Sequence, residues 1–392
     1  PERFMDELFA YLSLNKNEYP VASQMFENSI MDKEYFRLLS DKFRSPHLWY
    51  HEDDDWKIRK AVWKNSPDLS KIDTSPLIIE TGRSVVNELT IVMYHYVRPI
   101  KNSQYPKIKA LELEGFKRQL DYLSSKYIFI TAEQLIAHSK EGKELPINAC
   151  YLTFDDGLKD HFEYVMPELL KRNIQGSFFP STNSIIKRQL LDVHAIHHIL
   201  ATSDCESLVF ELNQECLKHG ISSSKLEALN KIYSIESSLD SAEVMYVKNM
   251  LQFALSLDIR TAIISKLFKK YVGISQDDFA DELYLSAKDI QVLIENGMYV
   301  GSHGYSHLWL DKESFESQSI EIDASLKFLS DIGSKTKDWI MCYPYGAYNS
   351  DTLAILKDRK CAVGLTSKVG IAKIRQNNIL ELSRYDTNDF PQ

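Results

Sequence analysis

Short apolar runs alternate with amphipathic helical stretches in two separate parts of the chain, and this pattern constrains the fold more than any other feature. The runs are rich in β-branched and aromatic residues and lie at 89–94, 127–131, 150–154, 176–179, 298–302, 339–343, 362–366 and 379–383. Strands that alternate with helices in this way predict a parallel sheet or barrel. The two parts together hold roughly 200 residues, which suits one small (β/α) barrel. The sequence therefore predicts an α/β fold, a distorted (β/α) barrel.

Regions without a strand pattern precede and interrupt the barrel pattern. Residues 1–88 carry apolar residues at helical spacing and predict a helical N-terminal extension. Between the two barrel parts, the segments 208–217, 242–257 and 259–272 predict helices of an insertion. The predicted organisation is an extension at 1–88, a first barrel part at 89–185, a helical insertion at 186–285 and a second barrel part at 286–392.

Charge and composition exclude several classes of function. The 392 residues include 46 Lys and Arg against 55 Asp and Glu, a formal charge of −9, so nucleic acid is not an expected partner. No apolar run approaches the ~20 residues that a transmembrane segment needs. The first residues lack a basic segment followed by an apolar one, so the expected location is the cytoplasm. The five cysteines include no C-x-x-C pair, which argues against a disulfide framework and a cysteine-based zinc site.

A pair of aspartates follows one of the predicted strands. Asp155 and Asp156 stand in TFDDG at 153–157, between an apolar run and a glycine. In β/α folds the carboxyl ends of the strands carry the chemistry, and neighbouring side chains diverge. One carboxylate is therefore suited to bind a metal while the other acts as a base. The alternative is a strand that simply ends in an Asp-Gly turn.

Two histidine pairs have the i, i+4 spacing with which a helical turn holds a divalent ion. His303 and His307 follow the predicted strand at 298–302, without the Glu that a zinc-protease helix carries after its first His. His194 and His198 form the competing pair. No predicted strand precedes this second pair, and Asp192 beside it is suited to cap a helix. The spacing alone does not decide between the two pairs.

The order of the motifs is more specific than any one of them. MCYPYG at 341–346 also lies at a strand end, so FDDG, HxxxH and YPYG follow one another, each after a predicted barrel strand. In this arrangement, over about residues 89–185 and 286–392, the chain resembles the polysaccharide deacetylases of the NodB-homology group, carbohydrate esterase family four. MYHYV at 93–97 and FKRQLDYL at 116–123 are similar to members that act on surface or biofilm polysaccharides.

The resemblance implies a metal site and a mechanism. Asp156, His303 and His307 are the expected ligands of one divalent metal, with zinc as the expected ion and cobalt, nickel or iron as alternatives. The metal lowers the pKa of its water and polarises the acetamide carbonyl. Asp155 resembles the general base of the family. The backbone N–H of Tyr345 resembles the donor that stabilises the oxyanion.

Two positions depart from the family pattern. Cys342 stands where many members have the Arg that orients the base, and we expect Arg384, at the end of the last predicted strand, to take its place. No His follows His307, so the late His that serves many members as general acid is missing. His95, at the end of the first strand, is our first candidate for the group that protonates the leaving amine. The other candidates are His161 and His194.

The sequence thus predicts a metal-dependent hydrolase, a carbohydrate N-deacetylase that removes N-acetyl groups from an amino sugar in a glycan or glycan precursor. The expected partner is a carbohydrate that bears N-acetyl groups. Aromatic side chains suited to face a sugar ring are Tyr305, Trp309, Tyr343 and Tyr345. Two alternatives stay open: an amidase that acts on a non-sugar acylated amine, and a non-catalytic carbohydrate-binding relative. The sequence does not indicate the oligomeric state.

Overall fold

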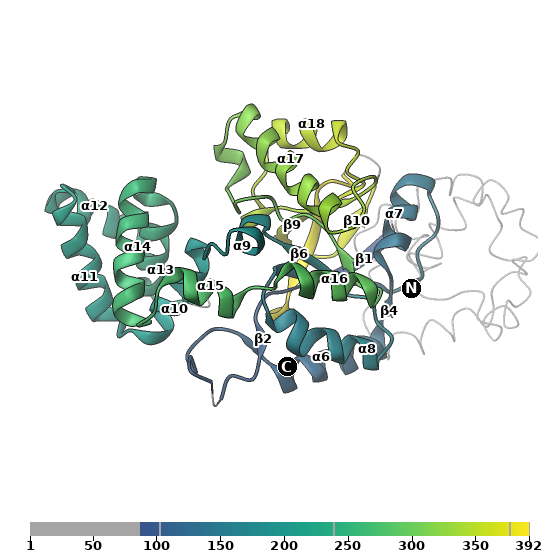
Figure 1. Cartoon of the computed structure of the whole chain (residues 1–392), viewed down its shortest axis with the longest axis horizontal. Coiled ribbons are helices and arrows are strands. Elements are labelled where there is room, and N and C mark those ends of the chain that lie inside the picture. The colour runs from purple at the N-terminus through teal and green to yellow at the C-terminus, as the bar shows by residue number, and fades with distance from the viewer. Residues whose placement is uncertain (1–86, 102, 238–239, 376–377, 392) are drawn as a thin grey trace, which may run out of the picture. The chain divides into compact units, whose positions relative to one another are not determined.

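A single, mainly parallel sheet forms the centre of the computed structural model, which describes residues 87–101, 103–237, 240–375 and 378–391 (Figure 1). The predicted N-terminal extension lies outside the described residues, apart from residues 87 and 88, which begin the first strand. The strands of this sheet are β1 (Asn87–Tyr94), β4 (Ile128–Phe129), β5 (Ala149–Asp156), β6 (Ser177–Pro180), β7 (Tyr299–Val300), β8 (Ile340–Cys342), β9 (Val363–Val369), β10 (Ala372–Ile374) and β11 (Leu382–Asp386). The strands β2 (Val97–Arg98) and β3 (Leu111–Glu112) form a separate parallel pair.

The sheet curls until its two edge strands meet. Its order is β7-β6-β5-β1-β11-β9-β8 with parallel neighbours, while β4 adds to β5 and β10 pairs antiparallel with β1. Just beyond β7, Ser302 forms a parallel bridge with Met341 of β8. The Ser302 N–H donates to the Ile340 carbonyl at 3.1 Å, and the Cys342 N–H donates to the Ser302 carbonyl at 2.9 Å. The predicted α/β fold with a distorted barrel is therefore confirmed.

Alternate residues of the strands face opposite sides of the sheet, as a period of two requires. One buried cluster collects side chains from the inner face, among them Ile91, Tyr151 and Ile340. The larger cluster holds the intervening residues, such as Val92 and Leu152, and packs them against the surrounding helices. The strands β5, β6, β7 and β8 are buried at every residue, so polar side chains at their ends lie over a buried interior.

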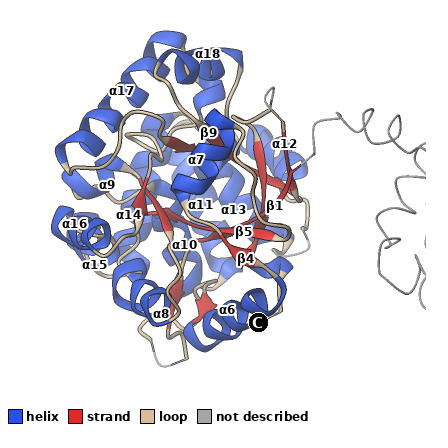
Figure 2. Cartoon of the chain, turned by 90° about the vertical axis from the view of Figure 1, so that its right-hand side faces the viewer, coloured by secondary structure: helices blue, strands red, loops and turns tan. Residues whose placement is uncertain are grey.

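Helices surround the strands (Figure 2). The first ones are α6 (Leu113–Lys126), α7 (Ala132–Glu141) and α8 (Met166–Lys171), the last preceded by a π-helical turn at His161–Val165. The helices between β6 and β7 are α9 (Thr182–Ile186), α10 (Asp192–Thr202), α11 (Cys205–Lys218), α12 (Ser223–Tyr233), α13 (Ala242–Asn249), α14 (Leu257–Tyr271), α15 (Gln276–Leu283) and α16 (Ala287–Glu295). The last two are α17 (Phe315–Asp331) and α18 (Ser350–Asp358). Among the described residues, none of these helices is long and apolar enough to cross a membrane.

The helices between β6 and β7 form a group of their own. Figure 1 shows α11, α12, α13 and α14 packed together away from the strands. The helix predicted at 242–257 ends early, because α13 runs into a π-helical turn at Met250–Ala254 and Leu255 is extended. Ser256, the residue before α14, is also extended. The predicted domain boundaries stay predictions.

Candidate functional site

The end of β5 presents the two predicted carboxylates in different directions. Asp156 has a left-handed backbone with φ of 74°, and Gly157 follows with φ of 72°. A side chain at Gly157 would clash, because an added Cβ would lie 2.7 Å from Cβ of Pro180. A non-glycine residue held in this conformation is strained, and such strain collects at functional sites. The turn directs Asp155 and Asp156 to separate partners.

His303 and His307 come together through a loop after β7 and not through the helical turn that their spacing predicted. Gly304 and His307 have left-handed φ values of 72° and 57°, which a helix does not allow. Oε2 of Glu321 in α17 accepts the N–H groups of Tyr305 at 3.2 Å and Ser306 at 2.7 Å. This buried carboxylate holds the loop in shape, so the two imidazole rings lie 4.9 Å apart between centroids.

Asp156, His303 and His307 form a cluster that fits a metal ion. Nε2 of each histidine lies 3.3 Å from Oδ1 of Asp156, and all three side chains are buried. Oδ1 of Asp156 nevertheless has no hydrogen-bond partner among the described residues. Ligand atoms held tetrahedrally at about 2.0–2.1 Å from one ion lie about 3.3–3.4 Å apart. A divalent cation bound here would therefore satisfy an orphaned carboxylate oxygen, and both measured distances match such a site.

Hydrogen bonds and burial set the orientation and the charge of the proposed ligands. Nδ1 of His303 donates to the Cys342 carbonyl at 2.8 Å, which directs Nε2 toward Asp156. Burial opposes protonation of His303, but Cys342 and Asp156 hold its pKa well above its usual range, so a metal would displace a proton there. Burial lowers the pKa of His307 to about 4, which keeps this imidazole neutral at pH 7. Burial opposes the ionisation of Asp156, but His194, His303 and His307 outweigh it and hold the pKa of this carboxyl well below its usual range.

Asp155 lies on the inner face of the barrel against Arg384. The Arg384 guanidinium lies 2.8 Å from Oδ2 and 3.0 Å from Oδ1 of Asp155, and both side chains are 1% exposed. Nε of Arg384 also donates to the Thr366 carbonyl at 2.7 Å. Burial opposes ionisation of Asp155, but Arg384 and His303 lower its pKa further than burial raises it. The expected partner of Asp155 is therefore beside it.

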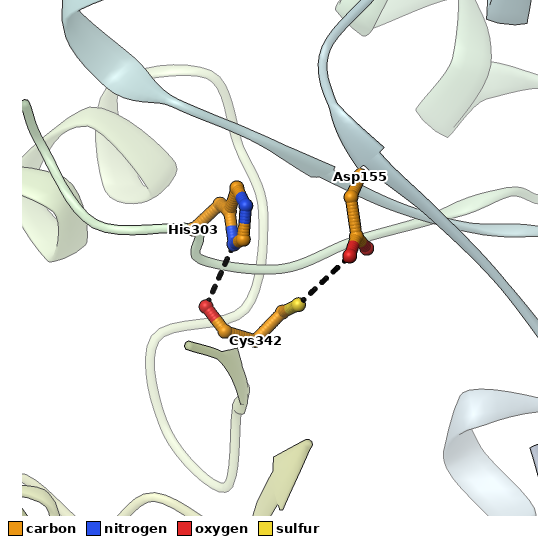
Figure 3. Close-up of side chains that lie close together, drawn as sticks. All are labelled: Asp155, His303 and Cys342. Atoms are coloured by element: carbon orange, nitrogen blue, oxygen red, sulfur yellow. Dashed lines mark hydrogen bonds between the residues drawn. The ribbon is translucent and has the colours of Figure 1, made fainter. Parts of the chain in front are cut away.

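Asp155, His303 and Cys342 form a second cluster with potential metal ligands (Figure 3). Cys342 lies between the other two: its carbonyl accepts from His303, and its Sγ lies 3.3 Å from Oδ2 of Asp155. Burial raises the pKa of the Cys342 thiol, whereas a metal needs the thiolate. The positive charge of Arg384 already compensates Asp155. A cation is thus favoured at the Asp156 cluster and disfavoured here.

The three candidate proton donors have very different surroundings. Nε2 of His95 lies 4.0 Å from Oδ2 of both Asp155 and Asp156, and its side chain is 39% exposed. His161 is buried in the core, where Nε2 donates to the His95 carbonyl at 2.9 Å. His194 is also buried, with Nε2 3.0 Å from Oδ2 of Asp156. Of the three, His95 combines nearness to the carboxylates with access to solvent.

Tyr345 lies beside the metal cluster in a tight turn. Its φ is 58°, and the Gly346 N–H closes the turn by donating to the Tyr343 carbonyl at 2.9 Å. The Tyr345 ring stacks on Trp309 with centroids 4.3 Å apart and meets His307 edge-on at 4.6 Å. Both Tyr345 and Trp309 are half-buried. The expectation that Tyr343 faces a sugar is wrong, because its ring is 1% exposed and its hydroxyl donates to the Leu380 carbonyl.

Two contributors to the site were missed in the sequence. Glu321 shapes the histidine loop, and His194 touches the carboxylate of Asp156 directly, a role different from the proton donor considered for it. The i, i+4 pair of His194 and His198 was a signal, but both lie on α10 without a preceding strand. Asp192 does not cap this helix, whose N-cap is Leu191.

Comparisons with known proteins agree with the family seen in the motifs. A sequence model described as polysaccharide deacetylase matches residues 262–363. The matched segment includes His303, His307 and Tyr345 but not the Asp155-Asp156 pair. The match covers about a quarter of the chain and agrees with the resemblance that the motifs indicate. A search of curated proteins finds no match.

Several solved structures are similar to this chain at low identity. The Streptococcus pyogenes deacetylase PplD in complex with acetate is 17% identical with a TM-score of 0.47, covering 77% of this chain and 93% of its own. IcaB from Ammonifex degensii is 17% identical with a TM-score of 0.46, covering 76% and 91%. The de-N-acetylase from Aggregatibacter actinomycetemcomitans is 14% identical with a TM-score of 0.44, covering 77% and 96%.

Proposed function

We propose that this chain, a member of the polysaccharide deacetylase family, is a metal-dependent hydrolase that removes N-acetyl groups from an amino sugar in a glycan or glycan precursor. One observation carries the proposal. The unpartnered Oδ1 of Asp156 faces Nε2 of His303 and His307 at 3.3 Å, beside a second carboxylate, Asp155, that Arg384 holds ionised. A metal site next to a buried carboxylate base is suited to hydrolysis.

Asp156, His303 and His307 are the proposed ligands, and zinc is the proposed ion because it takes nitrogen and oxygen ligands in tetrahedral sites. When bound, the metal would acidify a water and polarise the acetamide carbonyl. Asp155 is the proposed base, which accepts the proton of the attacking water. Its ion pair with Arg384 keeps it charged and fixes its orientation.

Two further groups would complete the reaction. His95 is the proposed acid, because its Nε2 lies 4.0 Å from both carboxylates and its side chain is 39% exposed. It would protonate the nitrogen of the leaving amino sugar while acetate is released. The backbone N–H of Tyr345 is the proposed donor to the oxyanion. The stacked rings of Tyr345 and Trp309 border the site and are suited to contact the sugar.

The test combines metal content with release of acetate. Wild-type protein, His303→Ala and the control His219→Ala, which changes an exposed histidine at the end of α11, are analysed for bound metal. The same three proteins are incubated with N-acetylated glycans, nucleotide sugars and non-sugar N-acetylated amines, and acetate is measured. We expect about one metal ion per chain in wild type and control, none in His303→Ala, and acetate only where metal is present.

Three other outcomes would contradict the substrate class, the catalytic activity or the metal site of the proposal. Turnover of the non-sugar amines alone would make the chain an amidase. Metal and sugar binding without acetate would indicate a non-catalytic relative. An absence of metal in wild-type protein after incubation with zinc, cobalt, nickel and iron would refute the metal site.

A further inference from the structure

His194 brings the helical segment between β6 and β7 into contact with the proposed metal site. It lies in the first turn of α10, and its side chain is 1% exposed. Nε2 of His194 is 3.0 Å from Oδ2 of Asp156, the oxygen that does not face His303 and His307. The two carboxylate oxygens of Asp156 thus have separate tasks: Oδ1 faces the proposed metal, and Oδ2 faces His194.

A series of hydrogen bonds runs from Leu191 through Tyr284 and His194 to Asp156. An ionised carboxylate only accepts, so Nε2 of His194 carries the proton. Nδ1 lies 2.5 Å from the Tyr284 hydroxyl, whose oxygen accepts the Leu191 N–H at 3.0 Å. When the His194 ring is neutral, Nδ1 accepts the hydroxyl proton of Tyr284. This chain of donors fixes both the tautomer and the orientation of His194.

The segment that carries Tyr284 is itself attached to the loop after Asp156. The Leu285 N–H donates to the Gly157 carbonyl at 2.9 Å, and the Lys159 N–H donates to the Leu283 carbonyl at 2.8 Å. Arg188, before α10, donates to the Leu285 carbonyl at 2.8 Å and to the Ala280 carbonyl at 3.1 Å. The two ends of the helical segment are therefore joined to each other and to the turn that presents Asp156.

We propose that His194 is a positioning residue of the metal site, which holds Asp156 so that Oδ1 alone is offered to the ion. The inference rests on the proposed function, because it needs Asp156 to be a ligand. A partner of this kind makes a metal-bound carboxylate or imidazole a better ligand, and its loss typically weakens metal affinity about 10- to 100-fold. The helical segment then contributes to metal affinity and not only to the outer surface of the protein.

The surroundings of His194 do not suit the role of proton donor to a substrate. Both ring nitrogens are engaged, one with Asp156 and the other with Tyr284, and the ring is buried. His95, at 39% exposure, has the access to substrate that His194 lacks.

The experiment compares two histidines of the same helix. His194→Leu removes the donor to Asp156, whereas His198→Leu makes the same change one turn later, where Nδ1 donates only to the His194 carbonyl. His194→Gln restores a donor near the position of Nε2, and Tyr284→Phe removes the hydroxyl that fixes the tautomer. The dissociation constant of zinc is measured for each full-length protein by competition with a chromophoric chelator. The cobalt-loaded proteins are compared by visible absorption, and folding is checked by circular dichroism.

We expect about 10- to 100-fold weaker zinc binding in His194→Leu, with most of the loss restored in His194→Gln. Tyr284→Phe should weaken binding by about threefold and alter the cobalt spectrum, and His198→Leu should leave both unchanged. Zinc affinity of His194→Leu within a factor of about two of wild type, or an equal loss in His198→Leu, would overturn the inference alone. If His194→Leu fails to fold, an unchanged zinc affinity in Tyr284→Phe overturns it. Failure of wild-type protein to bind any metal would instead remove the proposed function.

Discussion

Arg384 compensates the buried charge of Asp155, and replacing it should destabilise the protein strongly. In Arg384→Met the unbranched apolar part of the side chain is kept, but the guanidinium with its charge and its donors is lost. Asp155 then stays in a 1% exposed position, beside the Cys342 thiol at 3.3 Å and Nε2 of His95 at 4.0 Å. Removing one partner of a buried ion pair costs about 3–5 kcal/mol of unfolding free energy, because the remaining charge is left uncompensated.

A matched pair on the surface provides the control. Arg359 binds Asp323 through two parallel hydrogen bonds of 3.0 and 2.9 Å, but these side chains are 28% and 51% exposed. Solvent screens such a pair, so Arg359→Met should cost less than about 1 kcal/mol. The chemistry of the two ion pairs is the same, and burial is the main difference between them.

The assay is urea unfolding in the presence of a chelator, so that loss of metal does not contribute. Arg384→Met, Asp155→Asn and the double variant form a cycle, in which the lost bond to the Thr366 carbonyl cancels because it is missing with and without Asp155. The double variant should be more stable than the sum of the single effects by about 2 kcal/mol or more. Additive effects, or equal costs for Arg384→Met and Arg359→Met, would refute the argument.

Three further predictions concern other parts of the barrel. Gly346→Ala should cost about 1–3 kcal/mol and reduce acetate release, because the new Cβ would overlap Oγ of Ser367 in a residue with φ of 69°. Unchanged urea unfolding would contradict this prediction. Thr131→Ala should cost about 1 kcal/mol by removing the capping box of α7, and a cost near zero would mean that the cap contributes nothing. Burial lowers the pKa of His198 to about 3. The unfolded chain therefore binds a proton at His198 below about pH 6.5 that the folded protein does not bind. This residue alone should lower stability by about 1.4 kcal/mol per pH unit from pH 6 toward pH 4. His198→Leu should reduce this slope, and an identical slope would contradict the assignment.

The positions of the strands and of the two aspartates were predictable because they depend on local pattern. Most of the apolar runs lie in buried strands, such as those at β5 and β6, and the carboxyl ends of parallel strands meet at one end of a barrel. Asp155, Asp156 and Arg384 converge for this reason, although they are far apart in sequence. Their catalytic and metal-binding roles stay predictions.

The remaining features depend on contacts that the sequence does not show. The spacing of His303 and His307 suggested a helical turn, but a carboxylate from another helix, Glu321, fixes a left-handed loop instead. The contact of His194 with Asp156 joins residues of separate elements through a tertiary arrangement without a local signal. The strands β2, β3 and β10 contain two or three residues each, too few for a periodic pattern.

The barrel closes where its edge strands β7 and β8 meet, a contact that we call the seam, and a bound ion would stabilise it. One bridge, between Ser302 and Met341, closes the sheet there, and His303 is the next residue, with its Nδ1 bonded to the carbonyl of Cys342 across the seam. Opening of the seam would pull His303 away from the other ligands, so metal binding and closure must stabilise each other. The amide protons of Ser302 and Cys342, which bridge the seam, should therefore exchange with solvent more slowly by the factor 1 + [metal]/Kd when metal is added. Without metal, we expect the barrel to open locally between β7 and β8, next to the proposed site, and a bound ion to suppress this opening.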